Sequence, residues 1–149
     1  MQAILWSVDD RRKITWHIDH QRQKGAVLWG CGFRLDPSRF RVPLAGLIHL
    51  TKKAAKTPGI AAAAFVEEIL AYETSREPPG TDLIPPHYSR YGPDRYVTWL
   101  RLTSLTRVSP VVGTQTLTKV DGSPIRVPPQ AYVEVVFPEW AEDLLARPS

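Results

Sequence analysis

The sequence contains a single cysteine, Cys31, among 149 residues. One cysteine cannot form an internal disulfide and cannot supply a cysteine-rich zinc site. A reducing, cytoplasmic location is therefore the default prediction.

Long apolar runs are also missing. The longest, Ile60–Val66 and Ala131–Phe137, fall far short of the roughly 20 apolar residues that a membrane-spanning helix needs. Residues Met1–Val8 lack a basic leader and are followed by Asp9 and Asp10, so no secretory signal is expected. The sequence predicts no membrane partner.

Familiar catalytic motifs are absent as well: there is no Gly-x-Ser-x-Gly, no phosphate-binding P-loop and no His-Glu-x-x-His. His17 and His20 have a helical spacing, but a metal would need further ligands, and none is well placed nearby. Glu67 and Glu68 point to opposite faces of a strand. We expect no metal, no cofactor and no catalysis.

Positive charge is concentrated in the first part of the chain. Residues 1–60 hold eleven Lys and Arg against four Asp and Glu, whereas residues 61–149 hold eight against eleven. A basic half favours a polyanion such as nucleic acid, and the alternative is an ordinary solvated face. The residues expected to contact a nucleic-acid backbone are Arg11, Arg12, Lys13, Lys24, Arg34, Lys52, Lys53 and Lys56.

Apolar periodicity and turn residues predict a series of short strands with few helices. Strands are expected at residues 3–8, 26–33, 45–51, 94–108 and 130–137, and helices at about 9–22 and 138–146. The stretch 59–70 is ambiguous, since its alanines favour a helix whereas its Pro-Gly entry and continuous apolarity favour a buried strand; a strand is expected for its first part. The proline-rich stretch 72–93 is the part of the chain least typical of regular secondary structure. It nevertheless carries His87, Tyr88 and Tyr91, which are unusual in a simple linker. This composition predicts a single α+β domain built on a small β-barrel or curled sheet.

The stretch Lys24–Phe33 is unusual because glycines flank Cys31 on both sides and Trp29 lies at its centre. Glycine in a strand often marks the close approach of another backbone or of a ligand. Trp29 is interpreted as one wall of a pocket for a nucleobase. The alternative is a core tryptophan, which is the interpretation chosen for Trp6 and Trp99.

In order and spacing, these pieces resemble the EVE domains of the PUA-like superfamily, which are related to the YTH readers of methylated adenine. The resemblance is carried by a first strand ending in Trp6-Ser7, Gly25–Trp29 at the second strand, a Pro-Gly entry to the fourth, residues 95–102, and Asp121-Gly122 near the end. It covers residues 2 to 145 and implies a barrel of five or six strands with flanking helices.

The resemblance further implies a reader that flips a modified base, a methylated cytosine or adenine, into an aromatic cage. Such a domain can serve as the sensing module of a modification-dependent restriction system, with a fused or associated nuclease or NTPase as partner. Gly30 and Cys31 stand where the family has Ser-Thr. The base-binding residues are predicted to be Ser7, Trp29, Gly30, Cys31, His49, Tyr88, Tyr91 and Asp121, with Trp16 and Tyr72 as further candidates for the second cage aromatic.

Two alternatives stay open at this stage. One is an enzyme that acts on a base or nucleotide in the same pocket, with Cys31 or His49 in the chemistry. The other is a plain RNA-binding domain that recognises shape and charge only.

Overall fold

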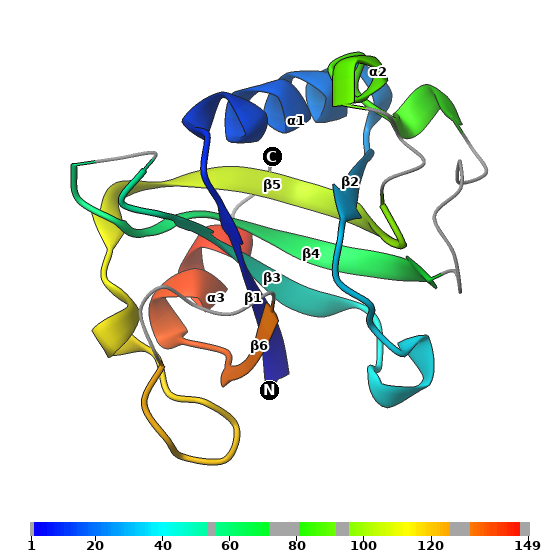
Figure 1. Ribbon diagram of the computed structural model, residues 1–149. Helices are drawn as coiled ribbons and strands as arrows, with labels where there is room; N and C mark the ends of the chain where they lie inside the picture. The colour runs from blue at the N-terminus through cyan, green and yellow to red at the C-terminus, as the bar shows by residue number, and fades with distance from the viewer. Residues whose placement is uncertain (1, 54–55, 72–80, 92–95, 126–131, 147–149) are drawn as a thin grey trace.

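The computed structural model describes residues 2–53, 56–71, 81–91, 96–125 and 132–146 (Figure 1). Its helices and strands in chain order are β1 (Gln2–Val8), α1 (Arg11–Lys24), β2 (Val27–Cys31), η1 (Pro37–Arg39), β3 (Leu44–Leu50), β4 (Gly59–Ala71), η2 (Thr81–Leu83), α2 (Tyr88–Tyr91), β5 (Thr98–Val112), η4 (Thr114–Thr116), β6 (Tyr132–Val136) and α3 (Glu139–Leu145). In the described part of the chain, no helix has the length and apolarity needed to cross a membrane.

The six described strands form one mixed sheet in the order β2-β5-β4-β3-β1-β6. Strands β1 and β3 run parallel, and the other neighbours are antiparallel. The parallel pair aligns Val8 with Leu50, so both strands end at the same edge of the sheet. This shared edge places the residues that follow each strand close together.

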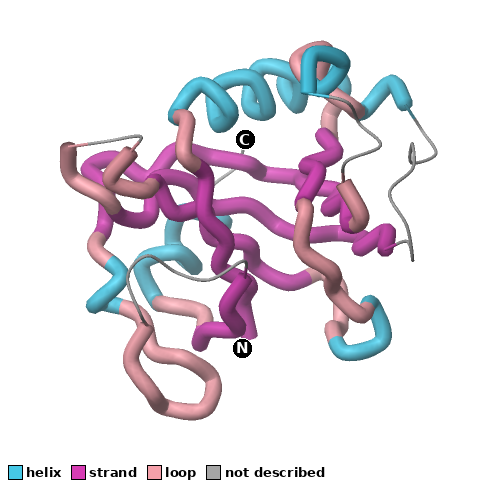
Figure 2. The backbone as a smooth tube through the Cα atoms, viewed as in Figure 1, coloured by secondary structure: helices cyan, strands magenta, loops and turns pink. Residues whose placement is uncertain are grey.

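The sheet is strongly curled. In a flat sheet, β1 and β2 would lie about 19 Å apart, four strand spacings of ~4.8 Å each. The ring of Trp6 on β1 nevertheless contacts the ring of Trp29 on β2, with centroids 5.9 Å apart. Figure 2 shows the strands as one curved layer with helices outside it.

The α+β class with a curled sheet is therefore confirmed, whereas a closed barrel is not. Strands β2 and β6 lie at opposite ends of the strand order, and among the described residues no pairing joins them. Side-chain packing between β1 and β2 brings the sheet round on itself without closing its hydrogen-bond ladder.

Each face of the sheet carries its own apolar core because successive side chains of a strand point to opposite faces. We call one the pocket-side cluster; it contains Ile4, Trp6, Val8, Ile14, Ile18, Val27, Trp29, Cys31, Ile48, Leu50, Leu100 and Leu102 among others. The other is the α3-side cluster, which contains Ala3, Leu5, Ala45, Leu47, Ile60, Ala63, Val108, Val135, Phe137, Ala141 and Leu145 among others. Helix α1 covers the first cluster and α3 the second (Figure 1).

Local signals account for most of the predicted elements. Helix α1 begins after Asp10, whose carboxylate accepts the backbone N–H of Arg12, and ends at Gly25, whose φ of 83° is left-handed. The fourth predicted strand is confirmed despite its alanines, because β4 runs from Gly59 to Ala71. Part of the stretch 72–93 lies outside the described residues; the described part, residues 81–91, contains η2 and α2.

Candidate functional site

A pocket of about 350 Å³ opens where the ends of β1 and β2 face each other across the curled sheet. This volume lies at the lower end of the range for small-molecule sites, roughly 300–1,000 Å³. The pocket is lined by Trp6, Ser7, Val8, Asp9, Lys13, Trp29, Gly30, Cys31, Gly32, Phe33, Thr51, His87, Tyr88 and Tyr96. Five of the eight residues predicted to bind a base are therefore brought together: Ser7, Trp29, Gly30, Cys31 and Tyr88.

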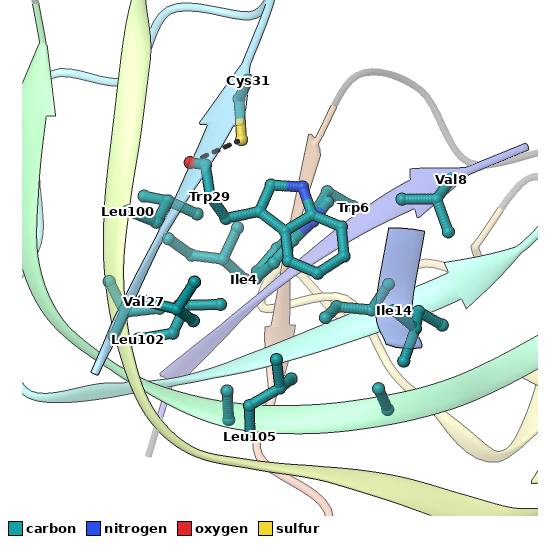
Figure 3. Packing of buried hydrophobic residues seen from close by; sticks show 14 of the residues in the cluster. Ile4, Trp6, Val8, Ile14, Val27, Trp29, Cys31, Leu100, Leu102 and Leu105 are labelled. Carbon is teal, nitrogen blue, oxygen red and sulfur yellow. Dashed lines mark hydrogen bonds between the residues drawn. The ribbon is translucent and has the colours of Figure 1, made fainter. Parts of the chain in front are cut away.

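Trp29 lies at the floor of this pocket. Its side chain belongs to the pocket-side cluster and is only 3% exposed (Figure 3). The imidazole of His17 stacks on one face of the indole, with centroids 3.7 Å apart and planes inclined by 15°. Trp6 approaches edge-on. A base that enters the pocket can therefore reach only a limited part of Trp29.

A hydrogen-bonded chain fixes the surroundings of Trp29. Nδ1 of His17 lies 2.6 Å from the carbonyl oxygen of Lys13, which can only accept, so this nitrogen carries the proton. Nε2 lies 2.7 Å from the hydroxyl of Tyr88 and accepts a hydrogen bond from it. The Tyr88 oxygen in turn accepts the backbone N–H of Gly30 at 2.8 Å. The chain ties α1, α2 and β2 together.

This chain requires a neutral His17. Complete burial lowers the pKa of His17 well below its ordinary value, and burial raises the pKa of Tyr88 well above its own. Protonation of Nε2 would remove the acceptor for the Tyr88 hydroxyl. In the neighbouring pocket wall, burial lowers the pKa of His87 to about 4.

The two glycines around Cys31 have different roles. A Cβ at Gly30 would lie 2.9 Å from Tyr96 and 3.1 Å from Trp99, so two rings of the protein itself occupy the space beside it. A Cβ at Gly32 would meet nothing within 4 Å, and this residue is exposed. Gly30 is thus explained by internal packing, whereas only Gly32 leaves room at the pocket edge.

Phe33 and Tyr96 are the aromatic residues of the pocket that keep part of their surface accessible. Phe33 follows β2 and packs against Tyr132, with centroids 5.3 Å apart. Tyr96 lies edge-on to Tyr88 at 5.2 Å. Sequence reasoning missed both residues, together with His17. The sequence carries one signal for Phe33: this residue ends the stretch Lys24–Phe33, in which glycines flank Cys31.

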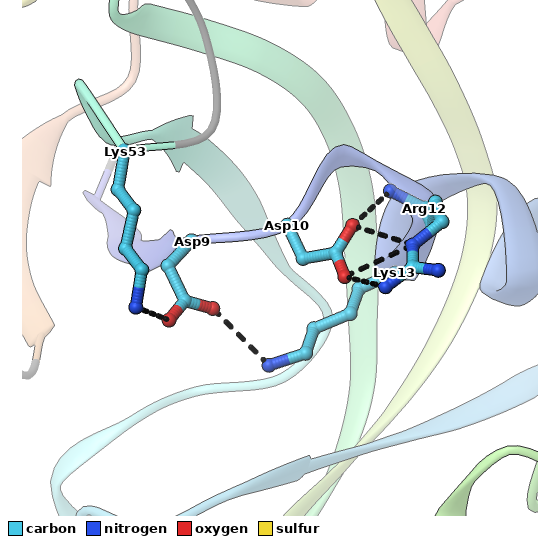
Figure 4. Close-up of polar contacts among 5 residues, drawn as sticks. All are labelled: Asp9, Asp10, Arg12, Lys13 and Lys53. Carbon is cyan, nitrogen blue, oxygen red and sulfur yellow. Dashed lines mark hydrogen bonds and ion pairs between the residues drawn. The ribbon is translucent and has the colours of Figure 1, made fainter.

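Charged side chains stand at the mouth of the pocket. Asp9 lies between two lysines: one carboxylate oxygen is 3.4 Å from Nζ of Lys13, and the other is 3.8 Å from Nζ of Lys53 (Figure 4). Asp10 pairs with Arg12 instead, at 2.8 Å. The hydrogen bonds from Arg12 lower the pKa of Asp10 below its ordinary value.

The remaining predicted base-binding residues are not gathered here. His49 does not line the pocket; its Nδ1 lies 3.3 Å from the hydroxyl of Ser7, its register partner on β1. Asp121 lies on an exposed turn, where its carboxylate accepts the backbone N–H of Ser123. The side chain of Tyr91 and all of Tyr72 lie outside the described residues.

The predicted backbone contacts are dispersed over the molecule. Arg11, Arg12 and Lys13 form the first turn of α1, Lys24 ends that helix, and Arg34 follows β2. Lys52, Lys53 and Lys56 lie on the connection between β3 and β4. Of these residues, Lys13 lines the pocket. Lys53 lies near the pocket mouth, where its Nζ is 3.8 Å from the carboxylate of Asp9.

Nothing in the described part of the chain groups three or more potential metal ligands. Cys31 is buried, and burial alone raises the pKa of its thiol far above the ordinary value. A thiol with a raised pKa is protonated at neutral pH, so little of it is in the thiolate form that acts as a nucleophile.

A second cavity of about 490 Å³ lies between α1 and the segment that contains α2. It shares His87 with the first pocket, and the rings of His87 and Trp16 are 4.5 Å apart. Its lining also includes Asp19 and His20 from α1 and Arg90 from α2.

The sequence matches no protein-family profile and no curated protein. The geometry of the chain itself therefore carries the functional argument.

Proposed function

We propose that this domain binds a nucleic-acid strand and holds one modified base, a methylated cytosine or adenine, in the pocket between β1 and β2. The observation that carries the proposal is the pocket of about 350 Å³, which joins aromatic walls to a mouth flanked by lysines. The base would be flipped out of the strand and would lie against Phe33 and Tyr96, above Trp29.

The fold supports the same assignment. The motif order resembles the PUA-like EVE domains, whose pocket lies on one side of a small barrel. In this chain the curl of the sheet brings Trp6 against Trp29, and a pocket lined by both rings opens on one side of the sheet, which supports the proposal. We propose that the domain belongs to this family and acts as a cytoplasmic sensing module beside a nuclease or NTPase.

The energetics require both stacking and polar contacts. Stacking on an aromatic side chain contributes roughly 1–3 kcal/mol per base. A buried methyl group adds only ~0.8 kcal/mol, so discrimination has to come from polar groups that the wrong base would leave unpaired. Trp6 Nε1 and Thr51 Oγ1 belong to pocket residues, are buried, and have no hydrogen-bond partner among the described residues.

The proposal assigns no catalytic step to the pocket. The raised pKa of Cys31 disfavours a thiolate, and His49 is engaged with Ser7 away from the pocket lining. Burial also lowers the pKa of His49, which makes it a weaker base.

The test is a titration of short DNA and RNA strands that carry one 5-methylcytosine, one N6-methyladenine or no methyl group, followed by tryptophan fluorescence. We expect one methylated strand to bind more tightly than its unmethylated counterpart. Phe33→Leu removes an aromatic wall, so its binding weakens by about ten-fold, the lower part of the stacking range.

Phe65→Leu is the matched control. Phe65 is also a partly buried phenylalanine, but it packs against the α3-side cluster. Its affinity for the strands should equal that of the wild type. Equal affinity for methylated and unmethylated strands, unchanged by Phe33→Leu, would contradict the proposal; charge-driven RNA binding would then be the better account.

A further inference from the structure

The charges at the pocket mouth are brought together by the topology. Because β1 and β3 are parallel and in register, they end side by side, and the N–H of Thr51 donates to the carbonyl of Val8 at 3.1 Å. Asp9 and Lys53 follow these two ends. Lys13 comes four residues after Asp9, in the first turn of α1. The three side chains thus meet from three different segments.

The Asp9 carboxylate uses its two oxygens on two different lysines. One oxygen is 3.4 Å from Lys13 and the other 3.8 Å from Lys53 (Figure 4). A phosphodiester also presents two anionic oxygens. The side chains of Asp9 and Lys53 are 51% and 80% exposed, so water screens their pairing and another anion can displace it at little cost.

The helix end adds a second reason for an anion at this place. The first turn of α1 contains no acidic residue and begins with Arg11, Arg12 and Lys13. The positive end of the helix dipole makes such cations unfavourable there and favours a phosphate. Asp10 supplies the cap and pairs with Arg12, so the helix does not need Asp9 for capping.

We infer that Lys13 and Lys53 form the site for the phosphate of the flipped nucleotide, and that Asp9 occupies this site in the free protein. The inference rests on the proposed function, because it uses the same pocket. On binding, the phosphate displaces the Asp9 carboxylate from the two lysines. Asp9 therefore lowers the affinity for every strand and reduces the attraction of the basic half for unselected nucleic acid.

The test compares three substitutions that change the net charge equally: Asp9→Asn, Asp36→Asn and Asp121→Asn. Asp36 and Asp121 cap exposed turns elsewhere, and asparagine can keep both caps. With the methylated and unmethylated strands as probes, Asp9→Asn should bind about five-fold more tightly, the size of one charge interaction at contact distance in water. The two controls should stay within about two-fold of the wild type, because salt screens distant surface charges.

Lys53→Gln tests the other side of the site. It should weaken binding of every strand by about five-fold, again the size of one contact charge pair. Lys119→Gln, on the turn that carries Asp121, should leave binding unchanged.

If Asp9→Asn binds no more tightly than Asp36→Asn, the inference is wrong. Weaker binding by Asp9→Asn would mean that the carboxylate contacts the base, which also overturns it. A five-fold gain on methylated and unmethylated strands that otherwise bind equally would support the phosphate site and contradict the modified-base proposal. Failure of the wild type and Asp9→Asn to bind any strand would overturn both.

Discussion

The two apolar clusters of this domain are built on the same sheet but from different residues. The α3-side cluster is made mostly of aliphatic side chains, such as Leu5, Leu47 and Ile60. The pocket-side cluster packs Trp6 and Trp29 beneath a buried histidine that takes part in a hydrogen-bonded chain. Each cluster fills one face of the sheet, and the pocket-side cluster borders the pocket between β1 and β2.

If the pocket binds a base as proposed, this difference separates residues that only stabilise the fold from residues that also shape the binding site. Aliphatic packing lowers the free energy of the folded state wherever the side chains fit closely. The His17–Tyr88–Gly30 chain also contributes hydrogen bonds, and it fixes the position of groups that line the pocket. Substitutions in the two clusters should therefore differ in their effect on binding more than in their effect on stability.

The largest effect is expected for Trp29→Ala, compared with Leu47→Ala. Removal of a buried tryptophan costs about 3–5 kcal/mol of unfolding free energy, and removal of a buried leucine about 2–5 kcal/mol. Urea unfolding measures both. In the folded fraction, Leu47→Ala should keep wild-type affinity for the methylated strand, whereas Trp29→Ala should lose it. Equal loss of affinity would remove the distinction between the clusters.

Gly30→Ala should cost about 2–3 kcal/mol, because its Cβ would collide with the rings of Tyr96 and Trp99. Gly32→Ala is the matched control. Since its Cβ would enter open space, the unfolding free energy should stay within about 0.5 kcal/mol of the wild type. Similar losses for the two variants in thermal unfolding would show that the packing explanation for Gly30 is wrong.

Tyr88→Phe should cost about 2 kcal/mol, because the buried N–H of Gly30 and Nε2 of His17 both lose their partner. The ring itself stays, so apolar packing changes little. Hydrogen exchange at the Gly30 amide should become faster than that at Leu47 in the α3-side cluster. Unchanged exchange at Gly30 would contradict the role assigned to the Tyr88 hydroxyl.

The smallest effect is a pH dependence carried by His17. Its pKa is near 6.5 in the unfolded chain and much lower in the folded one, so the unfolded state binds the proton first as the pH falls. The contribution of neutral His17 to the free energy of unfolding is therefore fully present above pH 6.5 and decreases as the pH falls below that value. Between pH 6.5 and 5.5 the wild type should lose about 1 kcal/mol more than His17→Phe, which keeps a ring on Trp29. The same loss in both proteins would contradict a neutral, buried His17.

Much of the fold could be predicted because its signals are local. Asp10 and Gly25 mark the ends of α1, and the apolar runs mark the strands. The number of strands does not determine whether the sheet closes into a barrel. Closure requires the two edge strands to pair, and the sequence pattern carries no direct signal for that pairing.

The site was predicted only in part for a similar reason. Ser7 and Trp29 could be chosen by their place in a motif, and the curl of the sheet brings them together. The sequence spacing presents His17 only as a possible metal ligand, because its contacts with Trp29 and Tyr88 join segments that are distant in the sequence. The glycine beside Trp29 suggested a ligand, but the space it leaves is taken by Tyr96 and Trp99.

The measurement that tests the central claim most directly is a nuclear magnetic resonance titration of the isotope-labelled protein with the methylated and unmethylated strands, followed at the glycine amides. Gly30 and Gly32 line the pocket, whereas Gly113 and Gly122 lie near η4 and on the Asp121 turn. The proposal predicts that the signals of Gly30 and Gly32 shift, and at a lower concentration of the methylated strand. Shifts confined to Gly113 and Gly122, or identical titrations with both strands, would contradict it.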